Sequence, residues 1–267
     1  MLRQSAYLGD YTTLTTTKFG QKIFLDTRDV SIAPHILLDG DWEAWITDGV
    51  MRLLGPVGAA DKARPPTFID VGANVGWYSL LAARFGFKVL AFEANHGLAQ
   101  LLTRSLAVNG YGNTKVLPIA ASDEHGVVQM RINPYNAGGS HIVGSAAMEE
   151  REDPMARMAL AATPTEVKCG PIHDYVDDEE EVTMMKIDVE GHEPEAIRGA
   201  SRVIDRNPRI MLAIEHNSGD GPLMKDLAER GFGFRYFATD GNQPAVAVEQ
   251  IDELPPATMI LAQRVTA

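Results

Sequence analysis

Residues 68–76 read Phe68-Ile69-Asp70-Val71-Gly72-Ala73-Asn74-Val75-Gly76, and this stretch decides the fold. An apolar run typical of a buried strand contains the carboxylate of Asp70. A turn with glycines follows, and then a helical pattern from about Gly76 to Phe85. A strand, a glycine turn and a helix in this order form the first unit of an open α/β sheet, which binds its ligand beyond the carboxyl ends of the strands. Because glycine has no side chain, Gly72 and Gly76 let the backbone approach that ligand closely.

The spacing of these glycines distinguishes between two cofactors. A dinucleotide site follows G-x-G-x-x-G and leads to a pyrophosphate at the helix N-terminus. Here the spacing is G-x-x-x-G, and Asp70 stands two residues before the first glycine. A carboxylate repels a phosphate but attracts a cofactor that carries an ammonium and a sulfonium. The turn therefore favours S-adenosylmethionine, and an NAD-dependent oxidoreductase is the disfavoured alternative.

The rest of the main region continues the alternation of strands and helices. Asn95 is expected to cap the helix that follows the second strand and ends near Asn109-Gly110. The pattern predicts a seven-stranded, mostly parallel sheet with helices on both faces. The expected strands are Thr67–Val71, Lys88–Glu93, Thr114–Ala120, Val182–Val189 and Arg209–His216, with Phe234–Ala238 and Thr258–Arg264 as a closing antiparallel pair.

Two regions depart from this alternation. Residues 1–60 predict an N-terminal cap or extension, with a hairpin over Lys18–Leu25 and a helix from Asp41 to Leu54 that Gly55-Pro56 stops. Residues 61–267 form the main domain, with an insertion around 126–178. Within the insertion, Val127–Ile132 is expected to be a strand, residues 136–140 a glycine loop, and Met148–Met158 a charged, Met-rich segment.

Composition bounds the partners and the compartment. The formal net charge is −12 and no Lys/Arg-rich block is present, so nucleic acid is not an expected partner. Cys169 is the single cysteine, which excludes an intrachain disulfide and a cysteine metal cluster. No run of about 18 apolar residues predicts a membrane span, and the first residues do not resemble a signal peptide. A cytoplasmic location is therefore the default expectation, and a homo-oligomer stays open.

Glu93 supports a nucleoside-type ligand. It ends the second strand, 17 residues after Gly76. A carboxylate at this strand end can accept hydrogen bonds from both ribose hydroxyls. The alternative is a surface glutamate near a helix N-terminus, where a negative charge is mildly stabilising.

Several segments carry a resemblance to a known family: Phe68–Tyr78, Phe92–Asn95, Pro118–Asp123, Gly138–Ser140 and Lys186–Glu193. Over roughly residues 25–240 the chain resembles the FkbM family of S-adenosylmethionine-dependent methyltransferases, a branch of the Rossmann-like class I methyltransferases. Asn95 departs from that family, in which a proline commonly follows the ribose-binding acid. Since asparagine caps a helix well, no loss of binding is expected.

The resemblance implies roles for the cofactor residues. Asp70 would lie near the methionyl amino group, Glu93 on the ribose, and Ser122 and Asp123 beside the adenine. For the last two, turn formation is an alternative, because Ser122–Gly126 has the composition of a turn. The remaining positions implied in the cofactor site are Gly72, Asn74, Gly76, Ala94 and Asp188.

Titratable residues at the ends of the fourth and fifth strands indicate the acceptor site. Methyl transfer from a sulfonium needs an aligned nucleophile and a group that removes its proton. His192 is the first choice for this base, with Asp188 and Glu215 as alternatives. Mg²⁺ or Mn²⁺ could also be bound here, by Asp188, Glu190, His192, Glu215 and His216. Carboxylates beside a cationic cofactor have a simpler purpose, so no metal is expected. Further residues expected to contact the acceptor are Ser140, His141, Glu190 and His216, although Glu190 could instead cap a helix and His216 could be a core histidine.

The sequence thus predicts an S-adenosylmethionine-dependent methyltransferase that acts on a small-molecule acceptor. O-methylation of a hydroxyl on a secondary metabolite or sugar is the leading hypothesis. N-methylation of an amide and a catalytically silent S-adenosylmethionine-binding module are the alternatives. The sequence does not identify the acceptor. The N-terminal segment and residues 134–165 are expected to form its pocket, and neither contains a motif of recognisable spacing.

Overall fold

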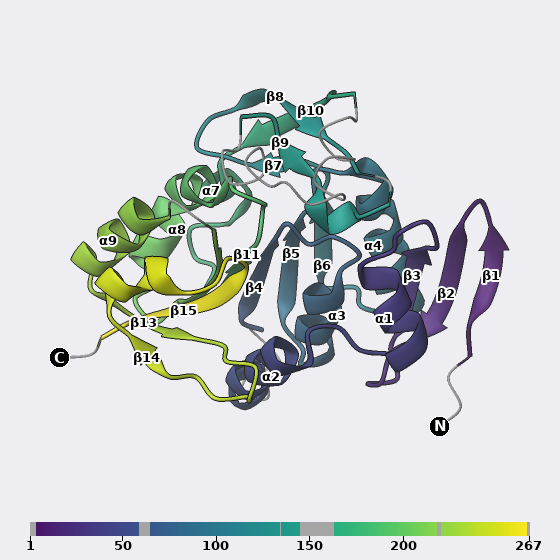
Figure 1. Cartoon of the computed structure of the whole chain (residues 1–267), viewed down its shortest axis with the longest axis horizontal. Helices are drawn as coiled ribbons and strands as arrows, with labels where there is room; N and C mark the ends of the chain where they lie inside the picture. The colour runs from purple at the N-terminus through teal and green to yellow at the C-terminus, as the bar shows by residue number, and fades with distance from the viewer. Residues whose placement is uncertain (1–3, 59–64, 134, 145–162, 218–219, 266–267) are drawn as a thin grey trace.

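The glycine turn joins β4 to α3 at the centre of an eight-stranded sheet (Figure 1). The computed structural model describes residues 4–58, 65–133, 135–144, 163–217 and 220–265. The sheet has the strand order β14-β13-β15-β12-β11-β4-β5-β6. In chain order its strands are β4 (Thr67–Val71), β5 (Lys88–Phe92), β6 (Thr114–Leu117), β11 (Val182–Ile187), β12 (Met211–His216), β13 (Phe232–Tyr236), β14 (Ala245–Val246) and β15 (Thr258–Arg264).

The pairing confirms the expected α/β class. β6, β5, β4, β11 and β12 are parallel, whereas β15 lies antiparallel to both β12 and β13. The prediction of seven strands was one too few. The additional strand, β14, has two residues and pairs with the edge strand β13, and a strand this short has no periodicity to detect in a sequence.

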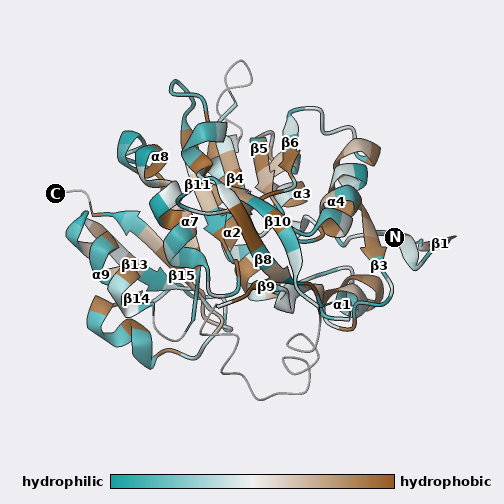
Figure 2. Ribbon diagram, turned by 90° about the horizontal axis from the view of Figure 1, so that it is seen from above, coloured by the Kyte–Doolittle hydropathy of each residue, from teal (hydrophilic) through white to brown (hydrophobic). Residues whose placement is uncertain are grey.

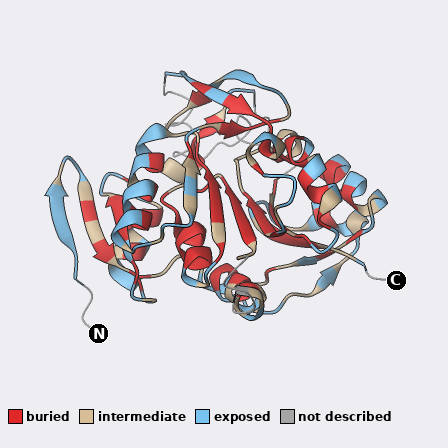
Figure 3. Ribbon diagram, turned by 180° about the vertical axis from the view of Figure 1, so that it is seen from behind, coloured by how far each residue is buried: buried red, intermediate tan, exposed pale blue. Residues whose placement is uncertain are grey.

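Helices cover both faces of this sheet, because alternate residues of a strand point to opposite sides. On β4, Phe68 belongs to the hydrophobic cluster that contains α3 and α4, while Ile69 and Val71 belong to the cluster on the other face. The central strands are hydrophobic and buried (Figures 2 and 3). The helices of the main region are α3 (Trp77–Arg84), α4 (His96–Val108), α7 (Glu193–Gly199), α8 (Ser201–Arg206) and α9 (Gly221–Glu229), with a 3-10 turn η3 (Val248–Glu253).

Asn95 begins α4 as the sequence predicts. Its side-chain oxygen accepts hydrogen bonds from the backbone amides of Gly97 (3.0 Å) and Leu98 (3.5 Å). The cap aligns the start of α4 directly after the end of β5, where Glu93 lies.

The N-terminal segment contains β1 (Ala6–Gly9), β2 (Thr12–Thr16), β3 (Lys22–Asp26), α1 (Ile32–Asp39) and α2 (Ala44–Gly58). The turn of the β2–β3 hairpin contains Gly20, but β2 lies earlier in the chain than the sequence suggested. The prediction that Gly55-Pro56 stops the helix was wrong, since α2 continues to Gly58. Leu53, Leu54 and Val57 pack on the core, and this packing outweighs the proline. The expected boundary near residue 60 lies outside the described residues.

A second, four-stranded sheet with the order β7-β10-β8-β9 lies above the first in the view of Figure 1. One strand was expected over Thr114–Ala120, but Pro118, which has no backbone N–H, separates β6 from β7. The expected strand near Val127–Ile132 is β8, and the segment Met148–Met158 lies outside the described residues. The elements of this region are β7 (Ala120–Ala121), β8 (Gly126–Arg131), η1 (Ala137–Gly139), β9 (His141–Ile142), β10 (Thr165–Gly170) and η2 (Ile172–Tyr175).

Within the part of the chain that the structure describes, no helix combines the length and the apolar character needed to cross a bilayer.

Candidate active site

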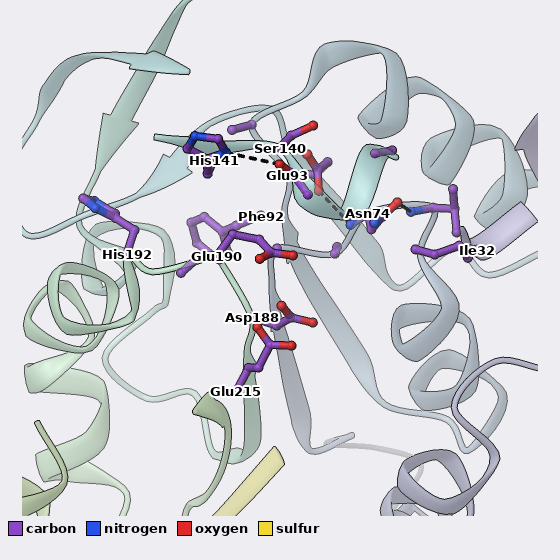
Figure 4. A pocket seen from close by; sticks show the side chains of 18 of the residues that line it. Ile32, Asn74, Phe92, Glu93, Ser140, His141, Asp188, Glu190, His192 and Glu215 are labelled. Carbon is purple, nitrogen blue, oxygen red and sulfur yellow. Dashed lines mark hydrogen bonds between the residues drawn. The ribbon is translucent and has the colours of Figure 1, made fainter. Parts of the chain in front are cut away.

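A pocket opens at the carboxyl ends of β4, β5, β11 and β12 (Figure 4). The glycine turn forms its floor, and residues of the N-terminal segment and of the second sheet form its cover. The polarity of the lining differs between the two sides of the pocket. Beyond β5 it is mainly apolar, with Ile119, Ala120 and Ala121, whereas near β11 and β12 it carries Asp188, Glu190 and Glu215.

The glycine turn is fixed by its neighbours on both sides. The amides of Gly72 and Ala73 both donate to the carbonyl of Phe92 at 3.0 Å. Gly72 has φ of 75°, and a Cβ atom there would lie 1.8 Å from the carbonyl oxygen of Asp188. Gly76 has φ of 88°, and its Cβ would lie 2.0 Å from Leu102 Cδ1. These positions need glycine for packing as well as for backbone conformation.

We expect Gly72→Ala to lower the free energy of unfolding by about 2 kcal/mol or more, since it adds left-handed strain and a backbone clash. Urea denaturation of the purified variant measures this loss. Gly112→Ala is the matched control, because a Cβ at Gly112 meets nothing within 4 Å. Equal stability of the two variants would contradict the proposed clash with the carbonyl of Asp188.

Glu93 is buried and faces the pocket. Its Oε2 accepts from the amide of Asn74 at 2.7 Å, and its Oε1 accepts from the amide of Asn95 at 2.8 Å. A carboxylate oxygen has two acceptor sites, so each oxygen retains one for a ligand hydroxyl. Burial raises the pKa of Glu93 to about 7, against the opposing effect of the two amide hydrogen bonds. Ala94 also lines the pocket.

Asp70 does not line the pocket. It lies on the same face of β4 as Phe68, and its Oδ2 accepts from Ser79 Oγ of α3 at 2.6 Å. Burial raises the pKa of Asp70. The side chain therefore joins β4 to α3 next to the glycine turn, and its expected place near the methionyl amino group stays a prediction.

Lys186 is a buried cation in the pocket lining, and the sequence argument gave it no role. It pairs in register with Asp70 across β11 and β4, its Nζ donates to Asp188 Oδ2 at 2.8 Å, and it lies 4.9 Å from the ring centre of Tyr78. Burial alone would lower the pKa of Lys186, but Asp188 and Asp70 together raise it above its usual range. Lys186 thus compensates carboxylates that would otherwise repel each other.

Asp188, Glu190 and Glu215 converge at the tips of β11 and β12, and each offers an oxygen within 4.8 Å of the others. β11 ends at Ile187, and Glu190 has φ of 54°. The strand is thus two residues shorter than the expected Val182–Val189, and a turn brings Glu190 to the cluster. Burial, followed by the charges of Asp188 and Glu190, raises the pKa of Glu215 well above its usual value. Such a cluster suits a cationic ligand, and its oxygen atoms could also hold a divalent metal.

His192 lies apart from this cluster (Figure 4). Its Nε2 is 3.2 Å from Ser122 Oγ and its Nδ1 is 3.4 Å from Glu195 Oε2. Burial lowers the pKa of His192, which favours the neutral imidazole. Asp123 accepts from Arg198 Nε at 2.9 Å, and neither Ser122 nor Asp123 is among the residues that line the pocket.

The other expected acceptor residues divide between the pocket and the core. His141 is buried in the pocket lining, and its Nδ1 is 3.2 Å from the carbonyl oxygen of Gly139. Ser140 also lines the pocket, but its hydroxyl accepts from the amide of Asn133 at 3.0 Å. His216 is buried outside the lining, with Nδ1 3.9 Å from Asp220.

Two functional features of the N-terminal segment were not predicted. Glu43 lines the pocket, and its Oε2 accepts from the hydroxyl of Tyr78 at 2.8 Å. Asp29 joins the two halves of the pocket cover. Its Oδ2 accepts from the amide of Ala137 at 3.0 Å. Its Oδ1 accepts from the amides at the start of α1, those of the N-cap residue Ser31 and of Ile32 and Ala33, at 2.7–3.1 Å.

The pocket fits S-adenosylmethionine by the chemistry of its lining. The apolar side beyond β5 suits a flat base, Glu93 offers acceptors for ribose hydroxyls, and the acidic side at β11 and β12 suits a sulfonium and an ammonium. Asn74, at φ of 54°, places its amide on Glu93 and so joins the glycine turn to the ribose acceptor.

Comparison with known proteins agrees with this chemistry. Residues 70–236 match the Methyltransferase FkbM domain. "Methyltransferase sdnD" of Sordaria araneosa is 27% identical over 62% of this chain and 73% of its own length. "Methyltransferase 1" of Beauveria bassiana (strain ARSEF 2860) is 23% identical over 73% of this chain and 80% of its own length. Among solved structures, a SAM-dependent methyltransferase from Agrobacterium tumefaciens aligns with a TM-score of 0.45 and 12% identity, covering 97% of this chain and 71% of that chain.

Proposed function

Because this chain belongs to the FkbM family of methyltransferases, we propose that it methylates a hydroxyl oxygen on a small molecule such as a secondary metabolite or a sugar. It is an S-adenosylmethionine-dependent enzyme. The observation that supports O-methylation most directly is the group of three carboxylates, Asp188, Glu190 and Glu215, at the acidic side of the pocket. A hydroxyl must lose its proton as it is methylated, and carboxylates of this kind can accept it.

When bound, the sulfonium of the cofactor supplies an activated methyl group. The chain then has to orient the two reactants and accept one proton. In this proposal Glu93 accepts hydrogen bonds from the ribose, and the glycine turn places backbone beside the ligand. Lys186 holds Asp188 in place at the edge of the carboxylate group.

Glu215 is the proposed proton acceptor. It lines the pocket at the tip of β12, and its raised pKa makes it a stronger base than an ordinary glutamate. Asn217 Nδ2 donates to Glu215 Oε2 at 3.4 Å and limits its orientation. His192, the first choice from the sequence, has both ring nitrogens near Ser122 and Glu195, so we assign it to positioning the turn after β11.

The test is transfer of a ¹³C-labelled methyl group from S-adenosylmethionine to a panel of hydroxyl-bearing and amide-bearing small molecules. We expect a new O–CH₃ resonance in the NMR spectrum of a hydroxylated product. An N–CH₃ product would replace the proposal by N-methylation of an amide. Tight binding of S-adenosylhomocysteine without transfer to any member of a broad panel would favour a silent binding module.

A further inference from the structure

Glu43 stands at a strained point of the N-terminal segment, immediately before α2. Its φ is 43°, in the left-handed region that side chains other than glycine rarely adopt. Its carbonyl accepts from the amide of Thr47 at 2.9 Å, so the first turn of α2 fixes this conformation. Backbone strain of this kind persists where the surrounding structure holds it, often at ligand sites.

The side chain of Glu43 is directed by a residue of the cofactor turn. Tyr78, whose hydroxyl donates to Glu43 Oε2, is buried and is the second residue of α3, two positions after Gly76. The N-terminal segment and the glycine turn therefore place one carboxylate in the pocket together.

Glu43 differs from Asp188 in its charge balance. Asp188 is paired with Lys186 at 2.8 Å. Among the described residues, no Lys, Arg or His nitrogen lies within 4.0 Å of the Glu43 carboxylate, and its hydroxyl partner Tyr78 is neutral. Burial raises the pKa of Glu43, and the charge of Lys186 opposes this rise only in part, because Asp188 adds a like charge. A ligand cation would supply the missing charge.

The position of Glu43 indicates which cation that is. Glu93 at the end of β5 is the expected acceptor for the ribose hydroxyls. The apolar lining beyond it, toward β6, suits the adenine base. The amino-acid end of the same ligand then extends the other way, over β4 and β11, where Glu43, Tyr78 and Lys186 meet. An α-ammonium at that end would face a carboxylate that Lys186 compensates only in part.

We propose that Glu43 is the counter-ion of the methionyl ammonium of S-adenosylmethionine, which makes the N-terminal segment part of the cofactor site. The inference rests on the proposed function insofar as that ligand binds in this pocket. It assigns the role that the sequence gave to Asp70 to a residue outside residues 70–236, the part that matches the family domain.

Calorimetry with two neutral or near-neutral nucleosides tests the assignment. S-adenosylhomocysteine carries the ammonium, whereas 5′-methylthioadenosine has the same base and ribose but no amino-acid portion. We expect Glu43→Gln to weaken binding of S-adenosylhomocysteine about tenfold or more, as for loss of a charge-assisted hydrogen bond. Binding of 5′-methylthioadenosine should change less than about twofold. Asp48→Asn, an exposed change on α2, should leave both affinities unaltered.

The other outcomes overturn the proposal in distinguishable ways. Equal weakening of both ligands would mean that Glu43 only shapes the pocket. Unchanged S-adenosylhomocysteine affinity with a large fall in kcat would move Glu43 to the acceptor side. If Glu43→Gln does not fold, Tyr78→Phe is used, and it should weaken S-adenosylhomocysteine but not 5′-methylthioadenosine. Failure of the wild-type protein to bind either ligand would instead refute the cofactor assignment itself.

Discussion

Replacing Glu215 with Gln is expected to lower kcat by about two to four orders of magnitude, the range typical for loss of a general base. The amide keeps the shape of the side chain but cannot accept a proton. Affinity for S-adenosylhomocysteine should change by less than about threefold, since an interaction made only during transfer affects kcat rather than ground-state binding. Steady-state kinetics and calorimetry on the same preparation separate the two effects.

The pH profile gives a second, independent measurement. Burial and the charges of Asp188 and Glu190 raise the pKa of Glu215, so its basic form becomes populated as the pH rises. In the wild-type enzyme kcat/KM should therefore increase with pH on its acidic limb, and this limb should be lost in Glu215→Gln. Full activity in EDTA is also expected, because the proposed role of the carboxylates requires no metal.

His192→Gln is the matched comparison. His192 lies within hydrogen-bond reach of Ser122 and apart from the carboxylates, so turnover should fall by no more than about tenfold. The opposite ranking, with a severe loss in His192→Gln and near-normal turnover in Glu215→Gln, would return the base to the residue that sequence reasoning favoured.

Those parts of the site that depend on sheet topology could be predicted from sequence. The carboxyl ends of parallel strands meet at one edge, so Glu93, Asp188 and Glu215 were expected in one cleft before their contacts were known. Strand alternation also predicts which face of β4 carries Asp70. Phe68 and Asp70 share a face of β4 that packs against α3.

The positions of other side chains depend on turns and on distant segments. After Ile187 the backbone takes positive φ at Glu190 and Gly191, and these two dihedral choices carry His192 toward Ser122. Glu43 enters the pocket through a left-handed residue at the start of α2, and Asp29 contacts Ala137 across more than a hundred residues. Neither a period nor a motif encodes contacts of this kind, because they arise when separately folded elements pack.

The second large effect is expected at Glu93. Glu93→Gln should weaken binding of 5′-methylthioadenosine about 100-fold at pH 8, because two charge-assisted hydrogen bonds to the ribose become weaker or are lost. The variant also removes a charged acceptor from the amide of Asn74 or Asn95, so its unfolding should be measured in parallel. If stability falls but affinity for 5′-methylthioadenosine does not, Glu93 serves the glycine turn and not the ligand.

The pH dependence of this binding follows from the pKa of about 7 for Glu93 in the free protein. Only the carboxylate can accept from both hydroxyls, so protonation competes with the ligand. Wild-type affinity should weaken about tenfold from pH 8 to pH 6 and should be nearly constant above pH 8. Glu93→Gln should show no such change.

The free energy of unfolding should depend on pH in the opposite direction. A carboxyl whose pKa is raised from 4.5 to about 7 by folding stabilises the folded state fully below pH 4.5, and that contribution is lost as the pH rises through 7. Between pH 5 and 8 the free wild-type protein should therefore lose stability relative to Glu93→Gln, while its affinity for the nucleoside increases. Both changes are expected if the ionised form of one buried carboxyl binds the ribose hydroxyls.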